Sequence, residues 1–97
     1  GIYAITKAAI IHMTKTFAKE CAEYNIRCNA ILPGFTRTRL ATALFEDENN
    51  YQKELAAIPM HRPAEPEEMA GAVLYLVSDA ASYTTGECLI VDGGKSL

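Results

Sequence analysis

Apolar positions at helical spacing dominate the first quarter of the chain. Residues 3–24 contain no Pro or Gly, and their apolar members lie near one helix face but spread beyond a narrow stripe. These members are Ala4, Ile5, Ala8, Ala9, Ile10, Ile11, Met13, Phe17, Ala18, Cys21 and Ala22. A stripe this wide predicts a helix that is buried on two sides, one against a sheet and the other against a second helix or a second subunit. Asn25 follows as a helix stop.

Two short apolar runs predict strands. Residues 26–32 are mostly apolar and end at Pro33-Gly34, which is typical of an interior strand in a parallel sheet. Residues 88–91 predict a last strand, which is closed by Asp92-Gly93-Gly94.

A long helix is expected before the last strand. Pro66-Glu67-Glu68 predicts its start, because proline suits the first helical position and carboxylates suit the positive end of the helix dipole. The helix should run to about Ser78, and Gly71 within it indicates close packing. Its expected buried residues are Met69, Val73, Leu74, Leu76 and Val77.

The region between the first strand and this helix has a mixed pattern. Residues 40–58 are helical in patches and are interrupted by an acidic and amide cluster at 46–50, which is typical of a mobile lid. The apolar residues expected to line a substrate pocket are Leu40, Leu44, Phe45 and Met60. Packing of the lid on itself explains the same residues equally well.

The order helix, strand, lid, helix, strand predicts an α/β sheet with right-handed crossovers. The 97 residues support one domain at most, and a hydrophobic content of 49% supplies ample core material. Two strands are too few for a sheet that is covered on both faces. The chain therefore reads as the second part of a larger domain. Its isolated form is expected to expose a strand edge and an apolar face, and so to be poorly soluble or oligomeric.

Charge and cysteine content exclude several classes of function. A formal charge of −3 with scattered Lys and Arg argues against nucleic-acid and acidic-membrane partners. No apolar run has the length of a membrane span. Cys21, Cys28 and Cys88 lack C-x-x-C spacing, and His12 and His61 lack ligand partners, so neither a disulfide framework nor a metal site is expected. The cysteines fit small buried hydrophobes in a reducing, cytoplasmic setting.

Tyr3 and Lys7 are the strongest candidates for chemistry. Residues four apart on a helix stand on one face, which places an ammonium beside a phenol. A nearby positive charge favours the phenolate, and such a phenol can give or take a proton. On spacing alone, an aromatic ring packed on a lysine stem is the commoner explanation of this pair.

Further stretches stand around this pair in a specific order. They are Tyr3-Ala4-Ile5-Thr6-Lys7, Ile26-Arg27-Cys28-Asn29-Ala30, Pro33-Gly34-Phe35-Thr36-Arg37-Thr38, and Thr85-Gly86 with Val91-Asp92-Gly93-Gly94. With these stretches the chain resembles the C-terminal part of a short-chain dehydrogenase/reductase, of the 3-oxoacyl-carrier-protein reductase kind. The resemblance implies the C-terminal part of a Rossmann-like doubly wound parallel sheet. Residues 1–97 would be the C-terminal portion of a single NAD(P)-binding domain whose N-terminal half is absent, with a lid-like insert at about 40–60.

The resemblance implies an NAD(P)-dependent oxidoreductase that transfers hydride between nicotinamide and a carbonyl or alcohol substrate. Tyr3 would be the proton donor or acceptor at the substrate oxygen. Lys7 would favour ionisation of Tyr3 and hydrogen-bond the nicotinamide ribose. The family's catalytic Ser, and the helix Asn of its proton relay, would lie upstream of Tyr3, so the 97 residues alone are expected to be inactive.

The resemblance also assigns the cofactor contacts after the first strand. Pro33-Gly34 would bring the backbone close to the nicotinamide, because a side chain at Gly34 would block that approach. Thr36 and Thr38 would contact its carboxamide or phosphates, although many family members carry Ile or Val where this chain has Thr36. An ordinary strand-ending turn explains Pro33-Gly34 equally well when the resemblance is set aside. Asn29 is expected to be structural.

The sequence leaves the cofactor, the substrate and the assembly open. The chain holds no glycine-rich phosphate loop, so the cofactor is NAD or NADP without a choice between them. Acyl-carrier thioesters, sugars and steroids all remain possible small-molecule substrates. The resemblance implies a homotetramer or dimer, but Lys95 stands where an aromatic residue is common, which weakens docking of the tail on a neighbour. The competing hypothesis is a truncated, non-catalytic chain that only assembles with full-length subunits.

Overall fold

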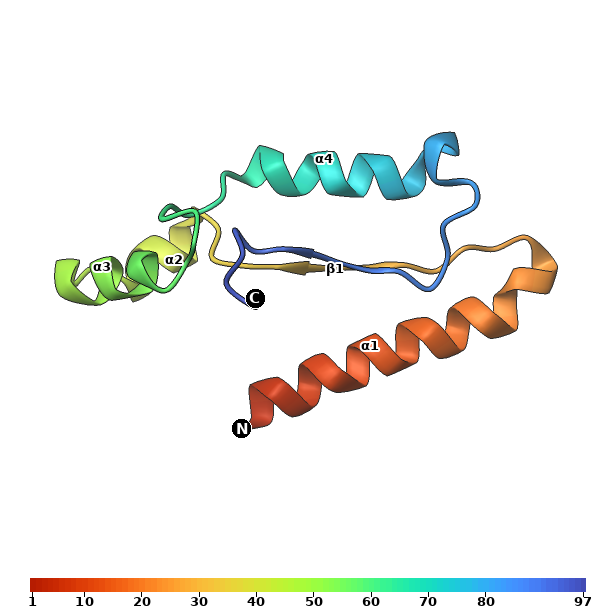
Figure 1. The fold of residues 1–97 in the computed structure, drawn as a ribbon, viewed down its shortest axis with the longest axis horizontal. Coiled ribbons are helices and arrows are strands. Elements are labelled where there is room, and N and C mark those ends of the chain that lie inside the picture. The colour runs from red at the N-terminus through yellow and green to blue at the C-terminus, as the bar shows by residue number, and fades with distance from the viewer. The chain divides into compact units, whose positions relative to one another are not determined.

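The computed structural model describes residues 1–97, except for the side chain of Leu44. The Leu44 side chain, expected above to line a pocket, therefore lies outside the described residues. The elements in chain order are α1 (Ile2–Cys21), η1 (Ala22–Tyr24), β1 (Ala30–Pro33), α2 (Arg39–Leu44), α3 (Glu48–Ala56), α4 (Pro66–Val77), η2 (Asp79–Ala81) and β2 (Cys88–Val91) (Figure 1).

The two strands pair in parallel. The amide of Ala30 donates to the carbonyl of Glu87 at 2.8 Å, and the amide of Gly34 donates to the carbonyl of Val91 at 2.9 Å. Both partners advance by four residues along the chain, which is the register of a parallel ladder. The structure therefore confirms the predicted α/β arrangement, with sheet order β1-β2.

Most element boundaries agree with the sequence-based expectation. The first helix ends in the η1 turn, and Asn25 then takes a left-handed conformation (φ 59°) that stops the helix as predicted. α4 and β2 begin where the sequence placed them. β1, however, begins at Ala30 and not at residue 26. The reason is that the preceding residues bind the 84–87 turn through scattered contacts, such as the amide of Cys28 donating to the Thr85 hydroxyl at 3.1 Å.

The chain divides into two compact units, residues 1–31 with 74–89 and residues 32–73 with 90–97. In the first unit, Ala18, Leu76 and Ala81 are buried. An added Cβ at Gly86 would lie 3.4 Å from the side chain of Ala18, so the turn before β2 packs closely on α1. In the second unit, Leu32 and Ile58 are buried.

Side-chain contacts within the first unit tie the turn before β2 to the chain that leads into β1. The Asn29 amide donates to the Thr84 carbonyl at 3.1 Å, and its oxygen accepts from the Glu87 amide at 2.9 Å. The Arg27 guanidinium donates to the Leu76 carbonyl at 2.7 Å and to the Thr84 carbonyl at 3.3 Å. Asn29 thus makes the contacts of a structural residue, as expected.

The helices bury less apolar surface than the sequence predicts. In α1 the buried residues are Thr14 and Ala18, whereas Ile5, Met13 and Phe17 are exposed. The prediction of burial on two sides is therefore wrong for the chain as described, because no described segment covers these side chains.

The same holds for α4. Leu76 is buried and Met69 is half-buried, but Val73, Leu74 and Val77 are exposed, contrary to prediction. An added Cβ at Gly71 would meet nothing within 4 Å in the described structure, so this glycine does not mark close packing here.

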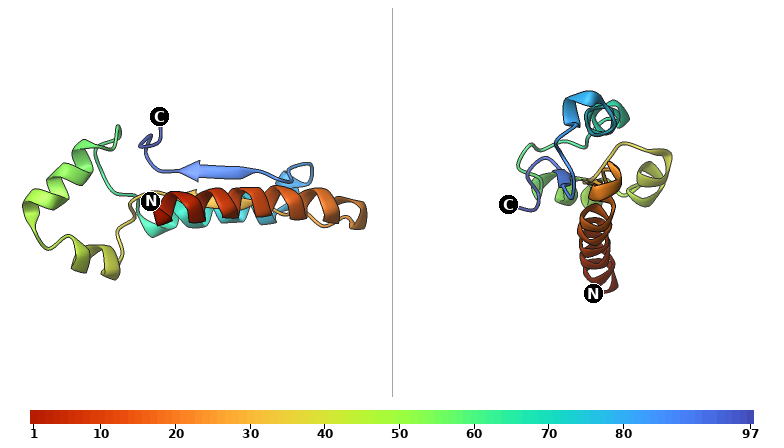
Figure 2. Two further views of the ribbon diagram at one scale, coloured as in Figure 1. Left: turned by 90° about the horizontal axis from the view of Figure 1, so that it is seen from below. Right: turned by 90° about the vertical axis from the view of Figure 1, so that its right-hand side faces the viewer.

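The segment between β1 and α4 forms two consecutive helices, α2 and α3 (Figure 2). The sequence-based break at 46–50 is too long, because α3 already begins at Glu48. Asp47 sets this boundary, since its carboxylate accepts from the Asn49 amide at 2.9 Å and caps the helix. Thr38 caps α2 in the same way, with its hydroxyl oxygen accepting from the Ala41 amide at 3.1 Å.

Candidate active site

Tyr3 and Lys7 lie in the first two turns of α1, in the first unit. The continuous helix from Ile2 places them on one face, one turn apart, as their spacing requires. The Tyr3 ring is 75% exposed, and Lys7 is half-buried. A phenol this open can meet a reacting molecule directly.

The loop after β1 holds the other candidate residues, in the second unit. Pro33 is the last residue of β1, and Gly34 continues the ladder to β2. A Cβ built on Gly34 would lie 2.6 Å from both the Cα and the Cβ of Asp92. The structure therefore supplies its own reason for a glycine here, which is the close approach of the two strand ends.

The two threonine hydroxyls of this loop already have local partners. Thr36 donates its hydroxyl hydrogen to the Gly34 carbonyl at 3.0 Å, which leaves only its oxygen lone pairs for another molecule. The Thr38 oxygen accepts from the Ala41 amide, so its hydroxyl hydrogen is left to donate. The family resemblance implies that both residues contact a cofactor. Thr38 keeps a donor for that purpose, whereas Thr36 keeps only acceptor capacity.

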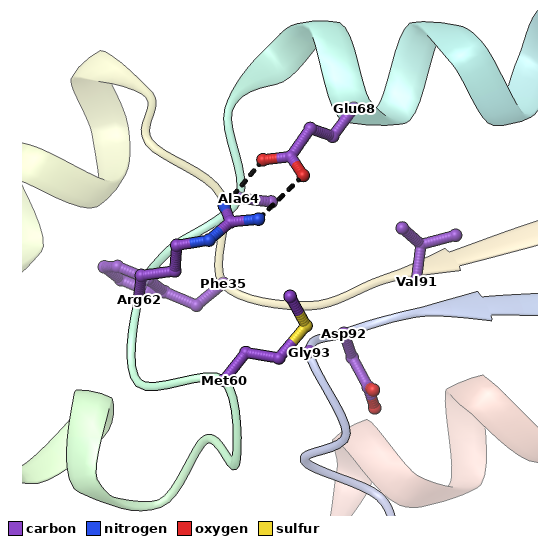
Figure 3. A pocket seen from close by; sticks show the side chains of 8 residues that line it. All are labelled: Phe35, Met60, Arg62, Ala64, Glu68, Val91, Asp92 and Gly93. Carbon is purple, nitrogen blue, oxygen red and sulfur yellow. Dashed lines mark hydrogen bonds and ion pairs between the residues drawn. The ribbon is translucent and has the colours of Figure 1, made fainter.

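An ion pair joins the end of the α3–α4 connection to the start of α4. Two guanidinium N–H groups of Arg62 donate hydrogen bonds to the Glu68 carboxylate, at 2.7 and 3.0 Å, as the dashed lines in Figure 3 mark. Glu68 also accepts from the amide of Glu65 at 2.9 Å, which is the third-residue half of a capping box. The Arg62 hydrogen bonds and then the Glu65 amide lower the pKa of Glu68 to about 2. Glu68 is thus a fixed anion and not a proton donor near neutral pH.

The residues around this ion pair enclose a small cavity of about 80 Å³. Met60, Val91 and Asp92 contribute side chains to its lining, as Figure 3 shows. The volume suits a few water molecules but not a substrate.

A larger cavity, of about 230 Å³, lies among the residues of α2, α3 and the loop after β1. Phe35 packs edge to face on Phe45 with ring centroids 5.0 Å apart, and its centroid lies 6.1 Å from that of Tyr51. Arg37 also lines this cavity and forms a 2.8 Å ion pair with Glu65. The Glu65 hydrogen bond raises the pKa of Arg37. Of the apolar lining expected from sequence, Phe45 belongs to this cavity, whereas Leu40 is exposed.

Asp92 organises the turn that follows β2. Its carboxylate accepts from the Gly94 amide at 2.9 Å, from the Ser96 amide at 3.1 Å and from the Ser96 hydroxyl. The Ser96 hydroxyl contributes most to lowering the pKa of Asp92. Gly93 and Gly94 both have positive φ angles, so the turn needs their conformational freedom. The predicted closure of the last strand by Asp92-Gly93-Gly94 is confirmed.

Sequence reasoning missed the partners of the charged residues at this end of the sheet. The spacing of Glu65 and Glu68 around Pro66 is a capping signature in the sequence, which the expected effect of carboxylates on the helix dipole does not include. The pairs Arg62–Glu68 and Arg37–Glu65 had no local signal, because each joins residues whose contact depends on the fold. The structure brings together Tyr3 with Lys7 in the first unit, and Pro33-Gly34 with Asp92 in the second.

Among the described residues, no helix could span a membrane, and no group of three or more His, Cys, Asp or Glu side chains could hold a metal.

Comparison with known proteins gives a consistent picture. The family described as "Enoyl-(Acyl carrier protein) reductase" matches residues 1–96. The NADH-dependent L-xylulose reductase of Ambrosiozyma monospora is 47% identical over 95 residues, which are 96% of this chain and 35% of that protein. The 3-oxoacyl-[acyl-carrier-protein] reductase FabG of Thermotoga maritima is 47% identical over 92 residues, which are 95% of this chain and 37% of that protein.

A solved structure agrees with these relatives. A putative 2-deoxy-d-gluconate 3-dehydrogenase from Agrobacterium tumefaciens, with bound NADP, superposes with a TM-score of 0.90 at 38% identity, covering 97% of this chain and 38% of that one. The chain thus spans between a third and two fifths of the length of these proteins. The match confirms a Rossmann-like α/β fold, of which these residues form part. Because one family pattern matches nearly every residue, this chain belongs to the short-chain dehydrogenase/reductase family.

Proposed function

We propose that this chain is the C-terminal portion of an NAD(P)-dependent oxidoreductase that interconverts a carbonyl and an alcohol. Within the single domain we infer, residues 40–60 form a lid over the substrate. The observation that carries the proposal is the Tyr3–Lys7 pair, the family's Tyr-x-x-x-Lys spacing, on the exposed start of α1. The spacing alone also occurs by chance in helices, but membership of the family supports Tyr3 and Lys7 as a candidate catalytic pair.

Tyr3 would exchange the proton of the reacting oxygen. In the reducing direction, the phenol O–H bond breaks and its proton forms the new alcohol O–H bond, while the carbonyl carbon accepts a hydride. Lys7, one turn along the same face, would stabilise the phenolate left behind and donate to the ribose hydroxyls of the cofactor. When bound, a nicotinamide cofactor supplies or accepts that hydride.

The residues after β1 fit a cofactor partly. Thr38 has a hydroxyl hydrogen left to donate, which suits a carboxamide oxygen or a phosphate. Thr36 is limited to accepting, which suits a carboxamide NH₂ group. The backbone of Pro33 and Gly34 would contact the cofactor. The closeness of Gly34 to Asp92 already explains why residue 34 has no side chain, so the glycine does not require a cofactor beside it. One relative is named as NADH-dependent and one solved relative holds NADP, so either cofactor is compatible with the proposal.

The substrate, the assembly and the cellular location are part of the proposal. The substrate would be a small molecule, and the relatives' names include an L-xylulose reductase and a 3-oxoacyl-[acyl-carrier-protein] reductase. The exposed apolar faces of α1 and α4 support assembly into a dimer or tetramer. We place the protein in the cytoplasm, where its three free cysteines would stay reduced.

The test is NAD(P)H-dependent reduction of a panel of keto sugars and 3-oxoacyl thioesters, followed at the cofactor's absorbance. Two proteins are compared, the 97-residue chain and the same chain extended upstream through the complete reading frame. We expect activity only in the extended protein, because the catalytic Ser and the phosphate loop would be supplied there. Activity of the 97 residues alone would overturn the dependence on an upstream half. Absence of turnover and of NAD(P)H binding in the extended protein would overturn the oxidoreductase assignment.

The competing proposal is a non-catalytic chain that only assembles with full-length subunits. The exposed apolar residues of α1 favour it, because they offer a surface for assembly. A reading frame that starts directly before Gly1 would support this alternative. A frame that continues upstream through a glycine-rich phosphate loop would exclude it.

A further inference from the structure

The turn after β2 packs on the chain that leaves α3. The amide of Met60 donates to the carbonyl of Gly93 at 3.1 Å. A Cβ added to Gly93 would lie 2.8 Å from Cγ2 of Ile58, which is 2% exposed. One added to Gly94 would lie 3.0 Å from the Pro59 ring. The two glycines, which both have positive φ angles, therefore bring the C-terminal turn close against residues 58–60.

An ion pair extends this contact to α3 itself. The ammonium of Lys95 lies 2.5 Å from the carboxylate of Glu54, and the Glu54 side chain is 23% exposed. Glu54 belongs to the last turns of α3, three residues before the helix cap at Ala57. The pair therefore joins two segments that are 41 residues apart in the sequence.

Asp92 fixes the geometry from which Lys95 reaches Glu54. Its carboxylate binds the Gly94 amide on one side of Lys95 and the Ser96 amide and hydroxyl on the other. The backbone at Lys95 is thus held on both sides, so its side chain starts from a restricted position. Less conformational entropy is lost when such a side chain forms its ion pair.

We propose that residues 92–97 form a strap that holds the end of α3 in place, with Lys95 and Glu54 as its charged closure. Lys95 and Glu54 are then positioning residues for the α2–α3 segment. Their effect on α3 is independent of the proposed oxidoreductase activity, whereas their effect on substrate binding rests on it, since the α2–α3 segment is the proposed lid.

Hydrogen exchange in the complete protein tests the strap directly. We compare wild type with Lys95→Met, Glu54→Gln and the charge exchange Lys95→Glu/Glu54→Lys, and follow the amides of residues 48–57. Each single variant should speed exchange there about three- to tenfold, and the charge exchange should restore it to within about twofold. Lys53→Met is the matched control, because it removes one positive charge from α3 but leaves Lys95 and Glu54 in place.

A second variant keeps the test independent of charge. Gly93→Ala places a methyl group against Ile58 and should also speed exchange at residues 48–57. Unchanged exchange in both single charge variants, or failure of the charge exchange to restore protection, would overturn the strap.

Steady-state kinetics adds the functional readout. If the α2–α3 segment covers substrate, the single variants should raise KM for the carbonyl substrate about threefold or more, with kcat within about twofold. An altered exchange rate without a change in KM would overturn the effect of the strap on substrate binding. A wild-type protein without activity would refute the proposed function and leave the exchange experiment to decide on the strap.

Discussion

Gly34 separates two explanations of the same residue. The family resemblance assigns its missing side chain to a nearby cofactor, whereas the structure places Asp92 against it. In Gly34→Ala the new methyl carbon would start 2.6 Å from the Cα and Cβ of Asp92, where real Cβ atoms essentially never lie. Neither atom can rotate away, so the two strand ends would have to separate. Overpacking of this kind costs about 1–3 kcal/mol, and the rigidity of both partners favours the upper value.

The assay is urea unfolding of the complete protein at a fixed protein concentration. With an m value of about 3 kcal/mol/M, a loss of about 3 kcal/mol lowers the unfolding midpoint by about 1 M. Gly71→Ala is the matched control, because it adds the same methyl group at a position in α4 where no atom of the described residues lies within 4 Å. A helix-interior Gly→Ala change there should raise stability by about 0.8–1 kcal/mol. Unchanged stability of Gly34→Ala together with weakened cofactor binding would refute the packing explanation and favour the cofactor.

Three further outcomes follow from the structure. The pKa of Glu68 is lowered from 4.5 to about 2 in the folded state, so its ion pair stabilises the fold above pH 4.5 and this stabilisation is lost as the pH falls to 2. In urea titrations, the stability difference between wild type and Glu68→Gln should therefore shrink between pH 4.5 and pH 2. Asn29→Ala should lower the free energy of unfolding by about 1–3 kcal/mol, because it removes both side-chain bonds to the turn before β2, and an unchanged urea midpoint would contradict this. The isolated 97 residues should sediment as oligomers or aggregates, because Ile5 and Phe17 expose apolar surface on α1, and a monodisperse monomer would speak against that.

Local chemistry made much of the fold predictable. The helix stop at Asn25, the helix start at Pro66 and the strand at 88–91 each depend on neighbouring residues, and each is present. The break at 46–50 was drawn too long because Asp47 acts as a cap and not as a helix breaker. Burial of Val73 was overestimated for a different reason. An apolar pattern records which surface must be covered, but it does not say whether the covering segment belongs to the same chain.

The site was predictable only where its residues are close in sequence. Tyr3 and Lys7 are four residues apart on one helix, so the spacing alone places them on one face. A Cβ at position 34 would lie 2.6 Å from Asp92, which is 58 positions away in the sequence, and no sequence pattern predicts this contact. The same limit applies to Lys95 and Glu54.

The central claim is that Tyr3 exchanges the substrate's proton, and kinetics of Tyr3→Phe in the complete protein test it most directly. The variant removes only the hydroxyl group, and Tyr83→Phe, at a fully exposed ring, is the matched control. We predict that kcat for carbonyl reduction falls about 100- to 10,000-fold in Tyr3→Phe, with NAD(P)H binding retained and with the control unchanged. A kcat for Tyr3→Phe within about threefold of wild type would contradict the account.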